Sequence, residues 1–206
     1  MKFVSKRSVV VLLVIAVGCA FSLSQAQAAD ATYLGASQCK MCHNKKDEGE
    51  QWNKWKAVKH SGAFETLKSP AAVKIGQDKG LPKPPSESPE CLKCHVTGYD
   101  AAAKTVPEKI KMEDGVQCEA CHGPGSEHAA AGKKFLFSKD TSIDMAATQK
   151  KVEAATCLKC HNEESPNWNP ERYTLKDGAK AGFDFDQAYK KIQHLNPKKH
   201  PEAAAG

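Results

Sequence analysis

The chain is 206 residues long with a formal net charge of +6, and only 7% of its residues are aromatic. Large apolar side chains are too few for an ordinary core, so a group other than side chains is expected to occupy the interior. The positive charge does not indicate nucleic-acid binding, because Arg172 is the single arginine after residue 28 and nucleic-acid binders cluster arginines.

Residues 1–28 are predicted to form a secretory signal peptide, which leaves 29–206 as a single domain. An apolar run over 9–17 is followed by Ala-Gln-Ala at 26–28, a small-x-small cleavage site. The run is shorter than the ~20 residues that span a bilayer, so no transmembrane segment is expected after cleavage. The basic residues that precede the run are Lys2, Lys6 and Arg7.

Cys19 lies in a segment that resembles a bacterial lipoprotein box, so a lipid anchor is the alternative to simple cleavage. Ala16 stands where such a box usually has leucine, and this departure favours cleavage after Ala28. Loss of the signal removes three basic residues and no acidic ones, so the net charge falls from +6 to +3. Either route exports the chain, and the predicted location is periplasmic or extracellular.

The chain has nine cysteines, and the eight that follow Cys19 form four C-x-x-C pairs, each followed directly by histidine. C-x-x-C-H is the attachment signature of c-type haem, in which both thiols bond to haem vinyl groups and the histidine binds iron. The motifs are Cys39-Lys40-Met41-Cys42-His43 (motif 1), Cys91-Leu92-Lys93-Cys94-His95 (motif 2), Cys118-Glu119-Ala120-Cys121-His122 (motif 3) and Cys157-Leu158-Lys159-Cys160-His161 (motif 4).

Three other interpretations explain the paired cysteines less well. Disulfides form outside the cytoplasm, zinc ribbons use paired C-x-x-C, and a thioredoxin-like redox pair occurs once in a domain. None of the three gives a reason for a histidine after every pair. The sequence therefore predicts four covalently bound haem c groups, each with its iron.

Four histidines remain outside the motifs, which equals the number of distal ligands that four bis-histidine haems require. They are His60, His128, His194 and His200. Methionine is the rival distal ligand, but one of the three methionines after residue 28 lies inside motif 1. The other two, Met112 and Met145, are interpreted as packing residues.

Short helices joined by long loops are expected along the chain. Apolar residues over 52–67 have helical spacing and share a face with His60, and those over 183–193 show the same spacing. Residues 148–159 are expected to be helical, whereas the proline-rich segment 69–90 is expected to be an irregular loop. The predicted fold class is mainly α with extensive loops and almost no β, a compact multihaem cytochrome fold with the haem cluster as its core.

Four segments together resemble the cytochrome c-554-type tetrahaem family. The most specific is Gly115-Val116-Gln117-Cys118-Glu119-Ala120-Cys121-His122-Gly123-Pro124-Gly125-Ser126-Glu127-His128. The others are 33–39, which leads into motif 1, 59–64 and 183–194. The similarity covers nearly all of the chain after residue 28. The chain is also similar to tetrahaem cytochromes that polymerise into extracellular electron-conducting filaments.

The resemblance implies three bis-histidine haems, each with one histidine from a motif and one from outside. The implied pairs are His43 with His128, His122 with His60, and His161 with His194. The second haem, on His95, has no protein distal ligand in the family's type member. His200 is left over, and three interpretations stay open for it: a solvated tail residue, a ligand to the second haem of its own chain, or a ligand to that of a neighbouring copy.

The predicted function is electron transfer, in which closely spaced haems pass single electrons through one domain. The expected partners are redox proteins that donate or accept electrons, an extracellular acceptor, or further copies of the chain in a filament. The alternative is an enzyme that reduces a small nitrogen oxide at a five-coordinate second haem. The full set of four spare histidines favours the carrier, so no catalytic residue is assigned.

Overall fold

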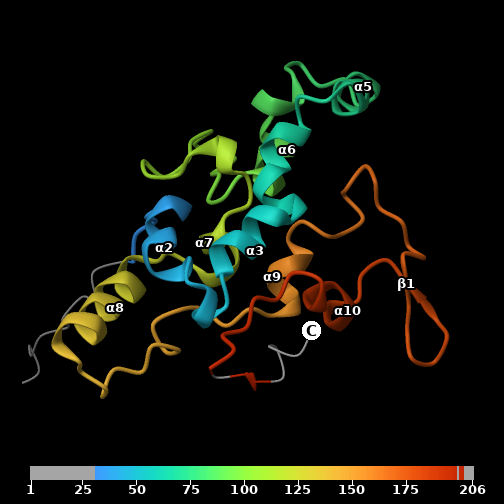
Figure 1. The fold of residues 1–206 in the computed structure, drawn as a ribbon. Helices are drawn as coiled ribbons and strands as arrows, with labels where there is room; N and C mark the ends of the chain where they lie inside the picture. The colour runs from blue at the N-terminus through green and yellow to red at the C-terminus, as the bar shows by residue number, and fades with distance from the viewer. Residues whose placement is uncertain (1–30, 199, 202–206) are drawn as a thin grey trace, which may run out of the picture. The chain divides into compact units, whose positions relative to one another are not determined.

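The computed structural model describes residues 31–198 and 200–201, and the predicted signal peptide and Cys19 lie outside these residues. The described chain consists of short helices, long connections and one two-stranded antiparallel sheet (Figure 1), which confirms the mainly α fold class. The α-helices are α2 (Ala36–His43), α3 (Gln51–Ala57), α4 (Ala63–Thr66), α5 (Pro70–Asp78), α6 (Pro89–His95), α7 (Cys118–His122), α8 (Ser126–Ser138), α9 (Ala154–Leu158) and α10 (Phe185–Lys190). The 3-10 helices are η1 (Lys46–Glu48), η2 (Lys59–Gly62), η3 (Pro85–Glu87) and η4 (Met112–Asp114), and the strands are β1 (Tyr173–Thr174) and β2 (Lys180–Ala181).

The apolar stripe predicted over 52–67 is helical but not continuous. α3 ends before Val58, which is extended (φ −99°, ψ 159°), and η2 and α4 then resume the helical path. The Ser61 hydroxyl lies 3.0 and 3.1 Å from the carbonyl oxygens of Lys56 and Val58. It can therefore donate a hydrogen bond to carbonyl groups that the end of α3 leaves without a helical partner. The break places His60 in the 3-10 turn η2 rather than on the face of a long helix.

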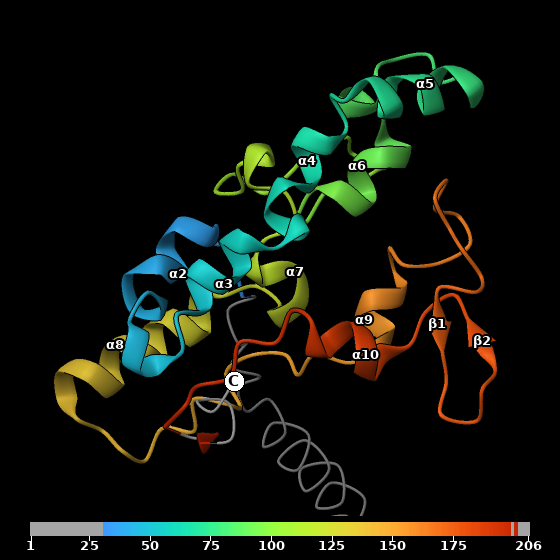
Figure 2. The ribbon, with the colours of Figure 1, turned by 45° about the vertical axis from the view of Figure 1, so that its right-hand side comes forward.

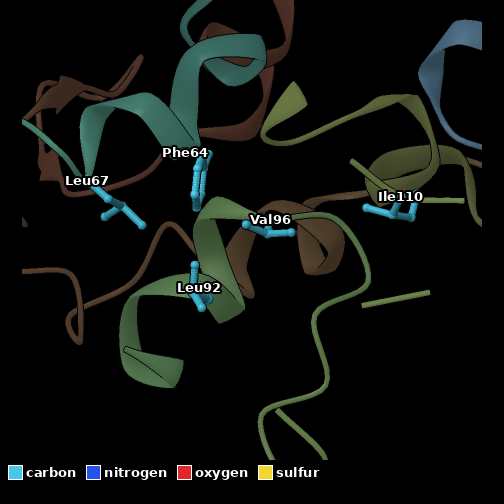
Figure 3. Packing of buried hydrophobic residues seen from close by; sticks show 5 residues of the cluster. All are labelled: Phe64, Leu67, Leu92, Val96 and Ile110. Carbon is cyan, nitrogen blue, oxygen red and sulfur yellow. The ribbon is translucent and has the colours of Figure 1, made fainter. Parts of the chain in front are cut away.

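One apolar core lies between α4 and α6. Five buried side chains form it, each at most 7% exposed: Phe64, Leu67, Leu92, Val96 and Ile110. Figure 3 shows Phe64, Leu92 and Val96 converging across the two helices. Full burial of a large apolar side chain is worth about 1.5–3 kcal/mol, so this cluster anchors α6 and with it motif 2.

The segment predicted as an irregular loop contains a helix. α5 begins directly after Ser69, whose hydroxyl oxygen accepts a hydrogen bond from the N–H of Ala72 at 3.2 Å. Pro70 occupies the first helical position, where its missing N–H and fixed φ are favourable. The loop prediction for 69–90 is therefore wrong over 70–78, and also over 85–87 and 89–90, where η3 and α6 begin with prolines. A proline breaks a helix only when it lies beyond the first turn.

The chain after motif 3 has little apolar packing of its own. Among the described residues after Glu119, none is buried by protein atoms. The helix expected over 148–159 begins only at Ala154, whereas the helix expected near 183–193 is present as α10. α9 and α10 lie side by side in both views (Figures 1 and 2). Within residues 31–198 and 200–201, no helix combines the length and apolarity needed to cross a bilayer.

Candidate haem-binding site

Each C-x-x-C-H motif lies on a short helix. Motifs 1 to 4 occupy α2, α6, α7 and α9, and motif 4 continues past the end of α9. There the N–H groups of Cys160 and His161 donate to the carbonyl oxygen of Cys157, at 3.1 and 2.9 Å, which prolongs the helical path. Residues three apart on a helix lie on the same face, so both thiols of a motif face one side. This is the arrangement that attachment to a single haem requires.

Three motif histidines each face a histidine from outside the motifs. The pairs, with the distances between their ring centroids, are His43–His128 (5.9 Å), His122–His194 (5.9 Å) and His161–His60 (6.0 Å). An imidazole nitrogen binds a metal at about 2 Å, so two rings on opposite sides of one iron have centroids roughly 6 Å apart. The residues present therefore fit three bis-histidine haems.

A hydrogen-bond relay orients the ring of His128. Its Nδ1 lies 2.9 Å from the Thr148 hydroxyl, which donates to the carbonyl oxygen of Met145 at 2.7 Å. Because the hydroxyl hydrogen is committed to Met145, the Thr148 oxygen accepts and Nδ1 of His128 carries the proton. Nε2 then keeps the lone pair that a metal binds, and the Thr148 contact fixes that tautomer.

Backbone carbonyl groups fix the tautomers of two further histidines. Nδ1 of His194 lies 3.0 Å from the carbonyl oxygen of Ile192, and Nδ1 of His95 lies 2.7 Å from that of Ala63. A carbonyl oxygen only accepts hydrogen bonds, so Nδ1 donates in both cases. Nε2 of each ring is thereby left to bind iron.

Burial favours the neutral form of five of the paired histidines. It lowers the pKa of His122 to about 4, with smaller contributions from His194 and other nearby imidazoles. A neutral ring keeps the lone pair that metal binding needs, which a protonated ring lacks. Burial is also the main cause that lowers the pKa of His60, His128, His161 and His194.

Motif 2 differs from the other three motifs. Among the described residues, no second histidine ring is paired with His95 as in the other motifs. His200 is exposed, and its N–H donates to the carbonyl oxygen of Asn196 at 2.9 Å. Three of the four spare histidines thus lie against motif histidines, and His200 is not brought to His95.

Two of the histidines are paired differently from the scheme that the resemblance implies. His60 lies against His161 rather than His122, and His194 lies against His122. The carbonyl oxygen of His60 accepts a hydrogen bond from the N–H of Val116 at 2.9 Å, so its backbone adjoins motif 3 while its ring reaches motif 4. A matched segment indicates where the backbone runs but not where a ring points, which accounts for the difference.

The thiols show which motifs adjoin one another. The thiol of Cys39 in motif 1 lies beside that of Cys118 in motif 3, and this proximity lowers the pKa of Cys39 and raises that of Cys118. Cys94 of motif 2 and Cys160 of motif 4 are joined in the same way, and the pKa of Cys94 falls to about 7. Motif 3 also adjoins motif 4, since the pKa of Cys121 is raised by burial and then by a motif 4 thiol.

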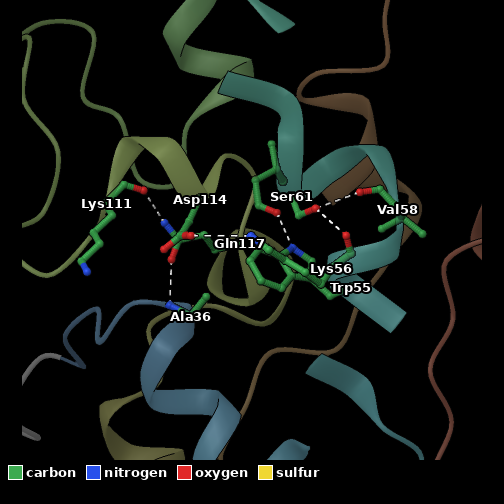
Figure 4. Close-up of polar contacts among 9 residues, drawn as sticks. Ala36, Trp55, Lys56, Val58, Ser61, Lys111, Asp114 and Gln117 are labelled. Atoms are coloured by element: carbon green, nitrogen blue, oxygen red, sulfur yellow. Dashed lines mark hydrogen bonds and ion pairs between the residues drawn. The ribbon is translucent and has the colours of Figure 1, made fainter. Parts of the chain in front are cut away.

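A buried glutamine ties three motifs together. Oε1 of Gln117 accepts a hydrogen bond from the N–H of Ala36 at 2.7 Å, and its Nε2 donates to the carbonyl oxygen of Lys111 at 2.9 Å (Figure 4). The backbone N–H of Gln117 donates to the Thr97 hydroxyl at 2.6 Å. Ala36 begins the helix of motif 1, Thr97 follows motif 2 and Gln117 precedes motif 3, so this network sets their relative positions.

Sequence reasoning did not single out these supporting residues. Gln117 and Thr97 are each only 1% exposed, yet both are residue types that usually lie at a surface. The one sign of their role is that each lies within two residues of a motif. Thr148 carries no such sign, because it meets His128 across 20 residues of chain.

Known proteins resemble the chain over most of its length. Residues 38–123 match the protein family described as cytochrome c554 and c-prime. The chain is 30% identical over 195 residues to cytochrome c-554 of Nitrosomonas europaea, an alignment that covers 85% of this chain and 80% of that protein. It is 22% identical over 132 residues to the multiheme cytochrome MtrA of Shewanella baltica, over 59% of this chain and 39% of that protein. No solved structure matches the chain significantly.

Proposed function

We propose, from the premise that this chain belongs to the cytochrome c554 family, that it carries single electrons through four covalently bound haem c groups. A multihaem c-type cytochrome of this family acts in electron transfer, and the iron of each haem supplies the one-electron chemistry. The observation that supports the proposal best is the set of three histidine pairs, each spaced for one iron. The four C-x-x-C-H motifs support the count of four.

The chain's own residues hold and orient these groups. Each motif supplies two thioether sulfurs and one proximal histidine, and His60, His128 and His194 act as distal ligands. Thr148 and the backbone carbonyl groups keep the protons on Nδ1, so that Nε2 faces iron. No side chain has to move for an electron to pass, which suits a carrier that holds its irons at fixed spacing.

The contacts between thiols support one order for the electron path. Motif 1 adjoins motif 3 through Cys39 and Cys118, and motif 2 adjoins motif 4 through Cys94 and Cys160. Motif 3 adjoins motif 4 through Cys121. Haem groups attached at adjoining thiols would lie close to one another, so the proposed path runs through motifs 1, 3, 4 and 2. Motifs 1 and 2 are its two ends.

The proposal extends to location and partners. Residues 1–28 act as a signal peptide that exports the domain 29–206 to the periplasm or beyond the cell. Donor and acceptor are redox proteins or an extracellular acceptor, and they meet the two ends of the path. His200 is the distal ligand of the haem on His95, from its own chain or from a neighbouring copy. In the second case copies join head to tail, as in a filament.

A second candidate function rests on the same motif. No histidine ring among the described residues lies across from His95 as in the other pairs. An iron with an open sixth position there would bind a small ligand such as a nitrogen oxide, and the chain would then be a reductase. The carrier is preferred because the other three sites are closed by a second histidine.

Haem stoichiometry and ligand binding test the proposal. Intact mass should exceed the mature chain by four haem groups that resist acid-acetone extraction. A spectrum unchanged by carbon monoxide, with His200→Ala gaining one carbon-monoxide-binding haem, is the result expected for the carrier. Fewer than four covalent haems would contradict the proposal. Carbon monoxide binding by the wild type would favour the reductase.

A further inference from the structure

Glu119 is a buried carboxylate between the two cysteines of motif 3. Its side chain is only 3% exposed. Oε1 accepts hydrogen bonds from the N–H groups of Leu34 and Gly125, at 2.9 and 2.7 Å, and Oε2 accepts one from Gly35 at 2.8 Å. All three partners are N–H donors. The ionised carboxylate, which only accepts hydrogen bonds, matches this set of donors.

The negative charge of Glu119 is hydrogen-bonded but is not neutralised by a positive side chain. Among the described residues, no lysine, arginine or histidine forms an ion pair with it. Backbone N–H groups stabilise a buried carboxylate by their dipoles, but they carry no net charge. One unit of negative charge therefore remains in a region where water does not screen it.

This charge lies where motif 1 meets motif 3. Gly35 and Leu34 lead directly into α2, which carries motif 1, while Glu119 itself is the neighbour of Cys118 in motif 3. The thiols of Cys39 and Cys118 lie beside each other at the same junction, where α2 contacts α7. Glu119 thus lies next to the attachment cysteines of motifs 1 and 3.

We propose that Glu119 is an electrostatic tuning residue that lowers the reduction potentials of the haems on motifs 1 and 3, an inference that rests on the proposed function. Reduction adds one electron from a donor redox protein and removes one unit of positive charge, with no bond made or broken and no proton transferred. A fixed negative charge nearby stabilises the more positive, oxidised state. Two of these hydrogen bonds tie Glu119 to Leu34 and Gly35, directly before α2, so they hold the charge in one position beside motif 1.

The test compares two substitutions at Glu119 in the haem-loaded protein by spectroelectrochemical titration. Glu119→Gln keeps the shape and removes the charge. It should raise two of the four potentials, with the ratio of reduced to oxidised haem at a fixed potential rising about tenfold, which corresponds to 59 mV for one electron. Glu119→Asp keeps the charge on a shorter side chain, so it should lose stability while leaving the potentials close to those of the wild type.

Gln117 supplies the control and a variant of opposite sign. Gln117→Ala removes an equally buried contact to the same chain segment without changing charge, so it should destabilise the protein and shift the potentials much less than Glu119→Gln does. Gln117→Glu adds a second negative charge beside Cys118 and should lower the same two potentials, even if Glu119→Gln fails to fold. The shifts should persist at high salt, because buried charges are poorly screened.

Two results would overturn the inference. One is unchanged potentials in Glu119→Gln with four haems and the low-spin spectrum of the wild type. The other is an equal shift in Gln117→Ala, which would make loss of packing the cause. Failure of the proposed function is distinguishable from both, because it would appear in the wild type as fewer than four covalent haems by mass.

Discussion

Motifs 2 and 4 are the same five residues, Cys-Leu-Lys-Cys-His, in two different surroundings. In motif 2 the leucine, Leu92, is 3% exposed and belongs to the apolar core with Phe64 and Val96. In motif 4 the equivalent Leu158 is 44% exposed. The same attachment sequence therefore occurs both packed against an apolar core and without one. The motif predicts haem attachment but does not determine how its leucine packs.

The same contrast separates two regions of the chain. Residues 31–119 contain every buried residue that the structure describes, whereas residues 120–198 contain none. The second region nevertheless supplies motif 4 and the proposed distal ligands His128 and His194. On the proposed function, the haems and their ligands would order the second region, whereas the first region is also stabilised by its buried side chains.

The largest expected effect comes from comparing the loss of one haem attachment site in 120–198 with the loss of one in 31–119. Cys157→Ala with Cys160→Ala should leave much of 120–198 open to protease, because this region has no buried side chains to hold it. The matched pair Cys91→Ala with Cys94→Ala should leave 31–119 resistant, because the α4–α6 core remains. Limited proteolysis with mass analysis of the fragments measures both, and equal resistance of the two variants would remove the distinction.

The two leucines give a smaller and sharper contrast. Leu92→Ala should lower the free energy of unfolding by about 2–5 kcal/mol, the usual range for a cavity in a core. Leu158→Ala should cost under ~1 kcal/mol, since its side chain is largely exposed. Denaturant unfolding of the haem-loaded variants provides the comparison. An equal loss would mean that haem covers Leu158 as thoroughly as protein covers Leu92.

Support of the distal ligand His128 should matter less for stability and more for ligand exchange. Thr148→Val removes the oxygen that accepts from Nδ1 of His128, and loss of such a partner weakens metal binding by about 10–100-fold. Added imidazole or cyanide should then displace His128 at lower concentration, as seen in the haem absorption spectrum. Thr141→Val, an exposed change in the same connection, should behave as wild type. Identical displacement in both variants would show that Thr148 does not support the ligand.

The smallest effect concerns one of the ion pairs that link the two regions. Nζ of Lys93 in motif 2 lies 2.7 Å from a carboxylate oxygen of Glu164, just beyond motif 4, and both groups are exposed. A double-mutant cycle with Lys93→Ala and Glu164→Ala should show weak coupling at low salt that vanishes near 1 M salt, where the Debye length is about 3 Å. Coupling that survives high salt would indicate a buried contact instead.

The sequence predicts the chemistry of the site better than its geometry. The helix before His194 follows from a local pattern and is confirmed as α10. The attachment cysteines and proximal histidines are likewise predicted from local patterns that need no tertiary contact. The α5 helix was not predicted, because the position of Pro70 relative to its cap Ser69 decides between helix and loop. The direction of the His60 ring depends on contacts between distant segments, which local patterns do not contain.

The buried polar contacts were beyond prediction for the same reason. Glu119 and Gln117 are charged or polar residues beside a motif, where solvent exposure is the usual outcome. The approach of 34–36, more than 80 residues earlier in the chain, contributes to their burial. The hydrogen bonds they accept are formed with backbone N–H groups, which every residue type except proline could supply.

Electron paramagnetic resonance of the oxidised protein, with haem quantified, tests the histidine pairs most directly. The wild type should show at least three low-spin bis-histidine haems among four per chain. Each of the variants His60→Met, His128→Met and His194→Met should lose one of those three signals and leave the others, since each ring serves one iron. A variant that retains every bis-histidine signal at full haem content would contradict the pairing on which the account rests.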